Sequence, residues 1–384
     1  MLENHSIICF AKDWDEDPTS NNHVMRMLAQ HNRVLWLNSV AMRKPSFTSG
    51  RDLHKIWEKI KKFLSGPRKV EAGLWVYTPL VIPFPHSRTA VIINAWILRF
   101  ILAIIRMKLG IRKYQLWTFL PTVGKYIGRL GEELVVYYCT DEWSHFSYLD
   151  GVKMATIEER LCREADVVFV TAHALFERKR QFNPETHLAL HGVDYDHFSK
   201  ALSEKTQIAP ELVNLPRPIL GFFGLIHEWI DLDLIAYLAE NRPNWNIVMI
   251  GKVQVDTARL SKYPNIHFIG QRQYRDLPKY CKGFSVSLIP FKVNELTVNV
   301  NPIKLREYLS AGLPVISTDL PEVKHYSKHC IIAKNYEEFL KGVETALQND
   351  SKASSIARSR EMCGETWERK VRDLGIHVER IIKK

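Results

Sequence analysis

The sequence predicts an α/β protein built from two doubly wound parallel sheets that face a central cleft. Apolar segments of strand length alternate with helical patterns in two successive series, which is typical of parallel sheets covered by helices on both faces. The chain has 384 residues, of which 46% are hydrophobic and 25% are charged. That length and composition indicate a folded protein with two domains of ordinary size.

The first series predicts an N-terminal domain, residues 1–190. A polar loop, Asp13–Asn22, follows the first strand and leads into a helix at about His23–His31. Each expected strand is a short, mainly apolar run, as is usual for strands buried on both faces. These strands are Ser6–Phe10, Arg33–Asn38, Leu74–Thr78, Tyr114–Phe119, Leu134–Cys139 and Val167–Val170.

The second series predicts a C-terminal domain, residues 191–353, which begins near His191-Gly192-Val193-Asp194. Helices are expected from about Leu232, Asp256, Leu277 and Ile303. The expected strands are Ile219–Gly224, Asn246–Ile250, Ile266–Ile269, Phe284–Ile289 and Pro314–Ser317. A last helical segment, 354–384, has no strand after it.

The helix that precedes the last strand carries a charge in an unusual place. Asn301 is a good N-cap, Pro302 suits the first helical position, and Gly312 suits the position just past the C-terminal end. Lys304 lies in the first turn, where the helix dipole disfavours a cation, and Glu307 follows on the same face. Free amides and a lysine at a helix N-terminus favour an anion, so the pattern suits the phosphate and ribose of a nucleotide sugar. The alternative is a surface lysine and a solvated glutamate on an ordinary helix.

A known signature is similar to this segment. The segment reads Pro302-x-Lys304-x-x-Glu307-Tyr308-Leu309-x-x-Gly312-x-Pro314-Val315. It resembles the signature of bacterial glycosyltransferases with the GT-B architecture. Within these, it is most similar to the family 4 (group 1) enzymes of exopolysaccharide and cell-surface glycan assembly. Segments 137–146 and 165–171, and 192–194 with Phe198, are also similar to that group. The resemblance covers most of the chain. It implies two Rossmann-like domains, the first for the acceptor and the second for the nucleotide sugar, and a C-terminal helix that crosses back to the first domain.

The resemblance also implies roles for residues of the second domain. Lys304 would neutralise the diphosphate leaving group and Glu307 would bind the ribose, without a metal ion. Gly224, at the end of the first strand of this domain, is a further candidate for binding the nucleotide sugar. Arg272 and Tyr274 follow a strand at the level of the base, and placement on the surface is the alternative for both.

Two positions depart from the family pattern. Asn299 stands where many family 4 enzymes have an acid that contacts the sugar, and Glu295 is a candidate substitute. The loop Gly224–Asp231 has neither the Arg nor the Lys that grips phosphate in many of those enzymes. The first departure implies that sugar recognition differs from that of the family, and the second places more of the expected phosphate binding on Lys304.

In the first domain, residues that follow strands are candidates for reactive groups. Asp141 follows a strand and is the candidate general base or acceptor-orienting acid, with His145 as a weaker catalytic candidate. The alternative for Asp141 is an N-cap. His173, Ser20 and Asn21 are candidates for binding the acceptor, and the alternative for the last two is again a helix cap.

The net charge of +11 comes from one segment. Residues 40–130 contain 17 Lys and Arg against 3 Asp and Glu. Within them, 53–64 has the pattern of a basic amphipathic helix, and 90–105 is almost wholly apolar but short for a membrane span of about 20 residues. This predicts a surface that sits on an anionic membrane, and the alternative is that both helices pack on the sheet. No helix-turn-helix, zinc-finger or RNA-recognition pattern appears, so nucleic acid is not expected as a partner.

These observations predict a peripheral enzyme at the inner face of the cell membrane. The six cysteines form no C-x-x-C pair and suit a reducing cytoplasm, and the N-terminus lacks the basic start of a signal peptide. The expected reaction moves a sugar from a nucleoside diphosphate sugar, with UDP favoured, to a lipid-linked or cell-surface glycan acceptor. We expect the enzyme to need no cofactor and no metal ion; the nucleoside diphosphate sugar is its donor substrate. The alternatives are a nucleotide-sugar epimerase of the same architecture and a catalytically inactive partner subunit.

Overall fold

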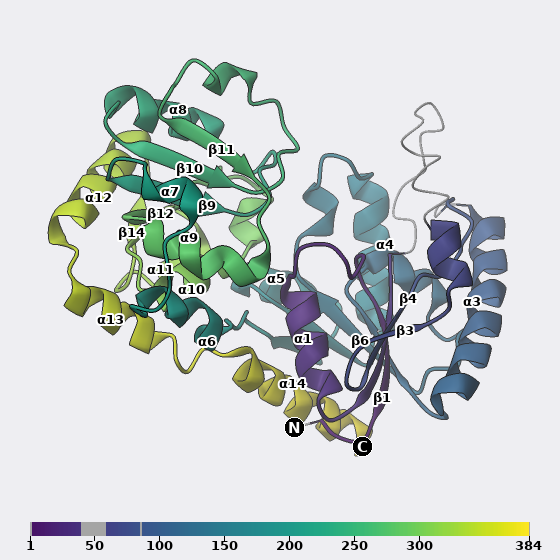
Figure 1. Ribbon diagram of the computed structural model, residues 1–384. Coiled ribbons are helices and arrows are strands. Elements are labelled where there is room, and N and C mark those ends of the chain that lie inside the picture. Colours follow the sequence, from purple (N-terminus) through teal and green to yellow (C-terminus); the bar gives the residue numbers. More distant parts are fainter. Residues whose placement is uncertain (1, 40–58, 85–86, 384) are drawn as a thin grey trace. The chain divides into compact units, whose positions relative to one another are not determined.

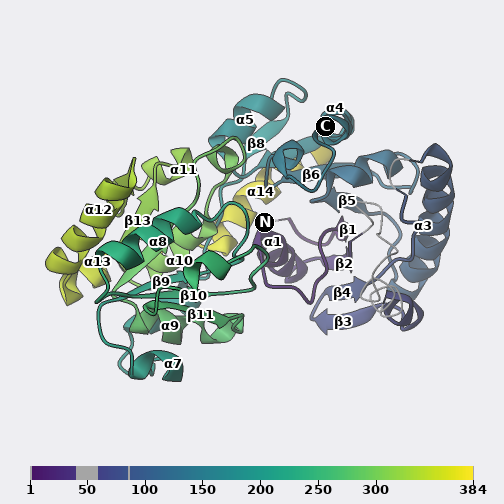
Figure 2. The ribbon, with the colours of Figure 1, turned by 90° about the horizontal axis from the view of Figure 1, so that it is seen from above.

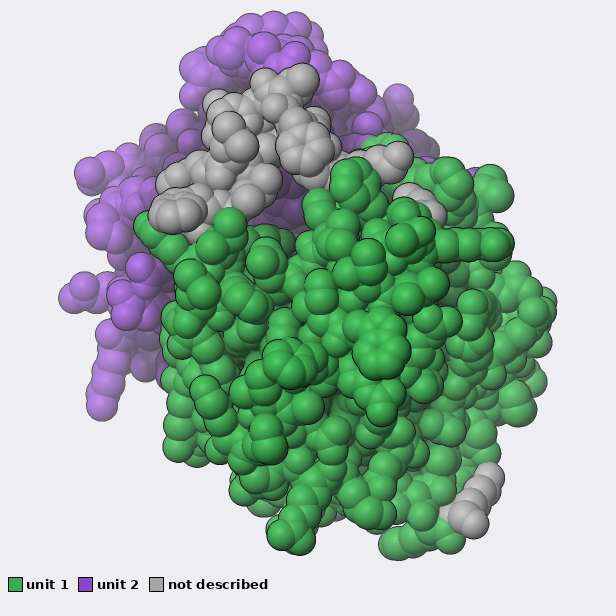
Figure 3. Space-filling model, turned by 90° about the vertical axis from the view of Figure 1, so that its right-hand side faces the viewer, with its two compact units in different colours: residues 1–190, 370–384 green, residues 191–369 purple. Residues whose placement is uncertain are grey.

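The protein is described by a computed structural model for residues 2–39, 59–84 and 87–383 (Figure 1). It divides into two compact units, which Figure 3 colours separately. Unit 1 comprises Met1–Leu190 and Lys370–Lys384, and unit 2 comprises His191–Arg369.

The sheet of unit 1 has eight strands in the order β3-β4-β2-β1-β5-β6-β7-β8. They are β1 (Ser6–Phe10), β2 (Arg33–Leu37), β3 (Arg68–Glu71), β4 (Leu74–Tyr77), β5 (Gln115–Thr118), β6 (Leu134–Cys139), β7 (Val167–Val170) and β8 (Thr186–Leu188). All neighbours are parallel except β3 and β4. The six expected strands are present, and β3 and β8 at the edges were not predicted.

Helices cover both faces of this sheet (Figure 2). They are α1 (Ser20–Ala29), α3 (Arg88–Leu109), α4 (Gly151–Glu164), α5 (His173–Lys179) and the part of α14 (Trp367–Ile382) that belongs to unit 1. Leu98 and Leu102 of α3 pack in the same hydrophobic core as Ile8 of β1. His377 of α14 stacks on His187 of β8. Of the expected helix 53–64, residues 59–64 are helical and 53–58 lie outside the described residues.

The sheet of unit 2 has six parallel strands in the order β11-β10-β9-β12-β13-β14. They are β9 (Ile219–Phe223), β10 (Asn246–Ile250), β11 (Ile266–Gly270), β12 (Val286–Ile289), β13 (Val315–Thr318) and β14 (Ile331–Ala333). The helices are α6 (Tyr195–Phe198), α7 (Pro210–Val213), α8 (Leu232–Asn241), α9 (Leu277–Gly283), α10 (Ile303–Ser310), α11 (Pro321–Lys324), α12 (Tyr336–Asn349) and α13 (Lys352–Glu361).

Two expectations for helices in the second half of the chain were wrong. The helix expected from Asp256 is a single 3₁₀ turn, Ala258–Leu260. The last helical segment is two helices, α13 and α14, because the chain between them is extended where Val193 pairs with Thr366. The amide of Val193 donates to the carbonyl of Glu365 at 2.8 Å. A side chain at Gly192 would lie 2.6 Å from the backbone nitrogen of Trp367, so this close pairing requires glycine.

The order of strands locates the site in unit 2. The chain starts at β9 in the middle of the sheet, adds β10 and β11 on one side, and then adds β12, β13 and β14 on the other. The strand order therefore reverses between β9 and β12, and ligands of doubly wound sheets bind outside the carboxyl ends at such a point. The segment after β12 contains the 3₁₀ turn Thr297–Asn299 and leads into α10, so the N-terminus of that helix lies at this end of the sheet.

Candidate functional site

The N-terminus of α10 differs from its predicted form. The predicted cap, Asn301, is wrong: the helix begins at Ile303, and Pro302 occupies the cap position without a side-chain hydrogen bond. The Oδ1 atom of Asn301 instead accepts a hydrogen bond from Nη1 of Arg306 at 2.8 Å. Arg306 is buried, so its guanidinium needs an acceptor, and this outweighs the capping preference of Asn301. Gly312 follows the last helical turn with φ = 77°, as predicted.

Contacts with the end of β9 fix the position of α10. The amide of Phe223 donates to the hydroxyl of Tyr308 at 3.0 Å, and the two rings meet edge to face with centroids 4.8 Å apart. Both residues are buried. These contacts therefore fix the position of α10 relative to the carboxyl end of β9.

Lys304 and Glu307 lie together at this end of the sheet. Nζ of Lys304 is 3.2 Å from Oε2 of Glu307 and 5.2 Å from the centroid of the Phe223 ring. The side chain of Lys304 is 23% exposed and that of Glu307 is 4% exposed. A Cβ atom at Gly224 would lie 3.1 Å from Cε of Lys304, so the lysine runs across the end of β9. The structure therefore brings Gly224, Lys304 and Glu307 together as the sequence predicted, although the ligand roles of these residues stay predictions.

Glycines form the ends of the neighbouring strands. Gly224 and Gly251 end β9 and β10, each with φ = 145°. A Cβ atom at Gly251 would lie 1.8 Å from the carbonyl oxygen of Gly224, so the two turns can approach this closely only without side chains. Two turns without side chains therefore lie beside Lys304, and such glycine turns let a nucleotide come close to the main chain.

The remaining candidates of unit 2 are engaged elsewhere. Asn299 is fully buried, and its Nδ2 donates to the carbonyl of Glu295 at 2.7 Å. Arg272 forms an ion pair with Glu211 at 3.0 Å and donates to the hydroxyl of Tyr280. Tyr274 stacks on His197, with ring centroids 4.7 Å apart, and packs against the core. The structure thus gives each of Asn299, Arg272 and Tyr274 a structural contact, and their nucleotide-binding roles stay predictions.

Asp141 lies in the loop after β6 in unit 1. It does not cap a helix: α4 begins ten residues later with Asp150 as its cap, and the 3₁₀ turn Trp143–His145 receives no side-chain cap. This removes the predicted alternative. Burial raises the pKa of Asp141, opposed by a hydrogen bond from Thr140 and supported by the charge of Glu158. A carboxyl with a raised pKa holds its proton more strongly, as a general base requires.

The other candidates of unit 1 follow the carboxyl ends of strands in the same sheet. His145 closes the 3₁₀ turn after β6, and His173 opens α5 after β7; both are half-buried. Ser20 and Asn21 begin α1 and are buried, with Ser20 Oγ 3.3 Å from Asn21 Oδ1. Neither is the cap of that helix, because the cap position belongs to Thr19. Their catalytic and acceptor-binding roles stay predictions.

Comparison with known proteins identifies the fold. The sequence model of the family described as glycosyl transferases group 1 matches residues 217–349, which lie within unit 2. Sucrose-phosphate synthase of Thermosynechococcus elongatus superposes with a TM-score of 0.70 at 13% identity, over 99% of this chain and 100% of that one. Anabaena HepE, solved in complex with UDP and glucose, superposes with a TM-score of 0.65 at 12% identity over 100% of both chains. The chain has the GT-B fold.

The resemblance to group 1 glycosyltransferases is thereby confirmed. A Bacillus subtilis protein named as a teichuronic acid biosynthesis glycosyltransferase, TuaH, is 27% identical over 213 residues. This match covers 50% of the chain and spans about half the length of that relative, 52%.

A buried group of charges in the GT-B fold was not predicted. Nζ of Lys179 donates to Oε2 of Glu158 at 2.8 Å and to both oxygens of Glu142 at 3.2 Å. The hydroxyl of Tyr137 donates to Oε1 of Glu158 at 2.5 Å. All three charged side chains are at most 6% exposed. Since Glu142 follows Asp141 directly, this group fixes the loop that carries the candidate base. Spacing alone could not reveal it, because its members come from β6, α4, α5 and a loop.

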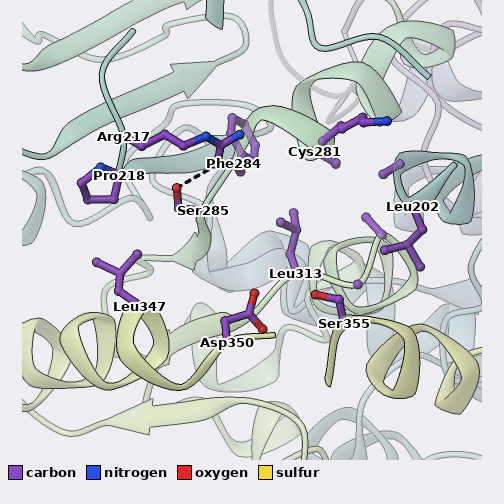
Figure 4. Close-up of a pocket in the computed structure, with 14 residues that line it drawn as sticks. Leu202, Arg217, Pro218, Cys281, Phe284, Ser285, Leu313, Leu347, Asp350 and Ser355 are labelled. Atoms are coloured by element: carbon purple, nitrogen blue, oxygen red, sulfur yellow. Dashed lines mark hydrogen bonds between the residues drawn. The ribbon is translucent and has the colours of Figure 1, made fainter. Parts of the chain in front are cut away.

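The pocket of Figure 4 lies elsewhere in unit 2. It has a volume of about 540 Å³ and is lined at the amino ends of strands, by Pro218 before β9, Ser285 before β12 and Leu313 before β13. Arg217 donates to the hydroxyl of Ser285 at 3.2 Å across its wall. The candidate nucleotide site at Lys304 lies at the opposite ends of the same strands, so this pocket is separate from it.

Proposed function

We propose that this protein is a glycosyltransferase that moves a sugar from a nucleoside diphosphate sugar, with UDP favoured, to a lipid-linked or cell-surface glycan acceptor in polysaccharide biosynthesis. It would act in the cytoplasm, at the inner face of the cell membrane. The observation that carries the proposal is the pair Lys304–Glu307 at the uncapped N-terminus of α10, beside the glycine-lined ends of β9 and β10.

The chemistry of the donor requires such a site. The departing nucleoside diphosphate gains negative charge in the transition state, and a fixed cation with free helix amides stabilises it more than the ground state. Lys304 would turn from Glu307 to the diphosphate, which leaves Glu307 to accept hydrogen bonds from the ribose hydroxyls. Because a lysine and helix amides can supply the positive charge, we propose that transfer needs no metal ion. The complex of HepE with UDP and glucose supports the choice of UDP.

The acceptor half of the reaction is assigned to unit 1. Asp141 would take the proton of the acceptor hydroxyl, and its raised pKa brings it closer to the working pH of a general base. His145, His173, Ser20 and Asn21 would orient the acceptor from the same edge of the sheet. The name of TuaH supports a cell-surface glycan as the product class.

Incubation with a panel of UDP- and GDP-sugars tests this function, with and without lipid-linked saccharide acceptors and with EDTA. We expect nucleoside diphosphate release that depends on the acceptor and survives EDTA. Formation of an epimer without acceptor would instead indicate the epimerase. UDP binding without turnover of any donor would indicate the inactive partner subunit, and loss of activity with EDTA would contradict metal independence.

A further inference from the structure

Helix α3 exposes an apolar face that the fold leaves uncovered. Among the described residues, α3 is the one helix whose length and apolar composition would allow it to cross a membrane. The sequence suggested a segment too short to span, but the helix extends to 22 residues, Arg88–Leu109, or about 33 Å at 1.5 Å per residue. Length therefore no longer decides between crossing a membrane and lying on one.

The packing of one face of α3 on the protein argues against a membrane-spanning helix. Ala95, Leu98, Leu102 and Ile105 pack into the core of unit 1, and Asn94 is buried with them. The side chain of Asn94 bonds both the amide and the carbonyl of Ile82, at 2.7 and 2.9 Å. A spanning α3 would lose this core and leave an asparagine in hydrocarbon. The helix therefore keeps one face on the protein.

The opposite face is apolar and exposed. Its large side chains recur at helical spacing, and each is at least 42% exposed. They are Ile92, Ile93, Trp96, Phe100 and Met107, with Trp96 and Phe100 both 69% exposed and Met107 76% exposed. The segment held by Asn94 adds Leu80 and Phe84, at 39% and 38%. We call these seven residues the α3 apolar surface. Figure 3 views the side of unit 1 along which α3 runs in Figure 1.

The stretch of sequence that contains α3 carries charge of one sign. No acidic residue occurs between Glu71 and Glu132, whereas eight Lys and Arg do. Arg88, Arg99 and Lys108 of α3 are exposed, and Arg112 follows the helix. A protein partner would meet an apolar patch with a cationic rim, but a tryptophan with basic residues beside it on a helix surface is the pattern of an interfacial helix on anionic lipid.

We propose that α3 lies in the plane of an anionic lipid bilayer, with the α3 apolar surface inserted among the lipids and its basic residues against the headgroups. This inference rests on the membrane location in the proposed function but not on sugar transfer. It gives that location a specific helix face, and it would bring a lipid-linked acceptor to unit 1.

Vesicle co-sedimentation of the full-length protein tests the proposal without donor or acceptor. We expect binding to phosphatidylcholine vesicles that contain about 30% phosphatidylglycerol, weak binding to phosphatidylcholine alone, and loss at about 0.5 M NaCl. The double variant Trp96→Ser/Phe100→Ser should bind at least about tenfold more weakly. Val152→Ser and Val213→Ser, at residues 81% and 62% exposed on α4 and α7, should bind as the wild type does.

Tryptophan quenching by brominated lipid gives a second measurement that does not depend on a disruptive variant. Among the tryptophans that the structure describes, Trp96 is the exposed one. Quenching should therefore fall sharply in Trp96→Phe, a variant that keeps the surface apolar. Equal binding by the wild type and the double variant would overturn the proposal. So would a change of oligomeric state in the double variant without a change in lipid binding, because it would show that a second copy covers this surface. A protein that binds vesicles but transfers no sugar would contradict the proposed reaction alone.

Discussion

Asp141 gives the proposed chemistry a measurable consequence at the scale of one residue. Because burial raises its pKa, the folded state binds a proton more tightly than the unfolded chain. The stability of the protein should therefore fall as pH rises from the ordinary aspartate pKa through the raised folded value, and the penalty is complete above that value. Below the ordinary pKa the carboxyl is protonated in both states and the penalty vanishes.

We predict that Asp141→Asn is more stable than the wild type at about pH 7 and equal to it at about pH 3. The same variant should lose about 10²- to 10⁴-fold in transfer rate if Asp141 is the general base. Thermal unfolding at the two pH values and a donor-turnover assay measure both effects. Asp150→Asn, at an exposed cap, is the matched control and should change neither. A variant with full activity would remove the catalytic role, and one with lower stability at about pH 7 would contradict the pH argument.

Single residues were predictable from sequence where their chemistry is local. Lys304 and Glu307 could be found because their spacing on one helix face is fixed by the helix itself. The role of Asn301 could not, because Arg306 competes for its oxygen and is held in turn near Glu365, whose Oε2 lies 3.8 Å from Nε of Arg306. Lys179, Glu158 and Glu142 likewise meet only through the fold.

At the scale of elements, the contact between β9 and α10 should control nucleotide affinity. Tyr308→Phe removes the acceptor of the Phe223 amide and leaves a buried N–H without its partner, which should destabilise the protein by about 1–3 kcal/mol. We predict that the variant also binds UDP several-fold more weakly, because the N-terminus of α10 is no longer held in register. Chemical denaturation and UDP titration measure the two effects.

Tyr263→Phe is the control for this experiment. Its hydroxyl bonds Glu240 at 3.2 Å in an exposed setting, so its loss should change little. If Tyr308→Phe is destabilised but binds UDP like the wild type, the contact supports the fold and does not position the site.

Strands were predictable in proportion to their burial. β1, β6, β7 and β10 have the predicted bounds because each is a run of apolar residues in the middle of a sheet. β3 was missed because Arg68, Lys69 and Glu71 are exposed on an antiparallel edge strand and give no apolar pattern. The three-residue strands β8 and β14 are too short to stand out from loops.

At the scale of the whole molecule, the alternation of strand and helix patterns predicted two parallel sheets covered by helices, and the distribution of Lys and Arg showed a local excess of positive charge. Both sheets are present, with the central strand of each coming first in the chain. Composition could not tell which face of the apolar segment 90–105 is buried, because Leu, Ile, Trp and Phe occur all round it. Only the packing of α3 on the sheet separates the buried residues from the exposed ones.

The central claim is that the N-terminus of α10 binds the diphosphate of a nucleotide sugar. Calorimetric titration of the full-length protein with UDP tests it most directly, with Lys304→Ala and, as control, Lys341→Ala at an exposed lysine of α12. We predict that Lys304→Ala weakens UDP binding about tenfold to a hundredfold, as expected for a lost charge-assisted hydrogen bond, and that Lys341→Ala leaves it unchanged. Equal affinity for UDP in a folded Lys304→Ala variant, or equal affinity of the wild type for uridine and UDP, would contradict the claim.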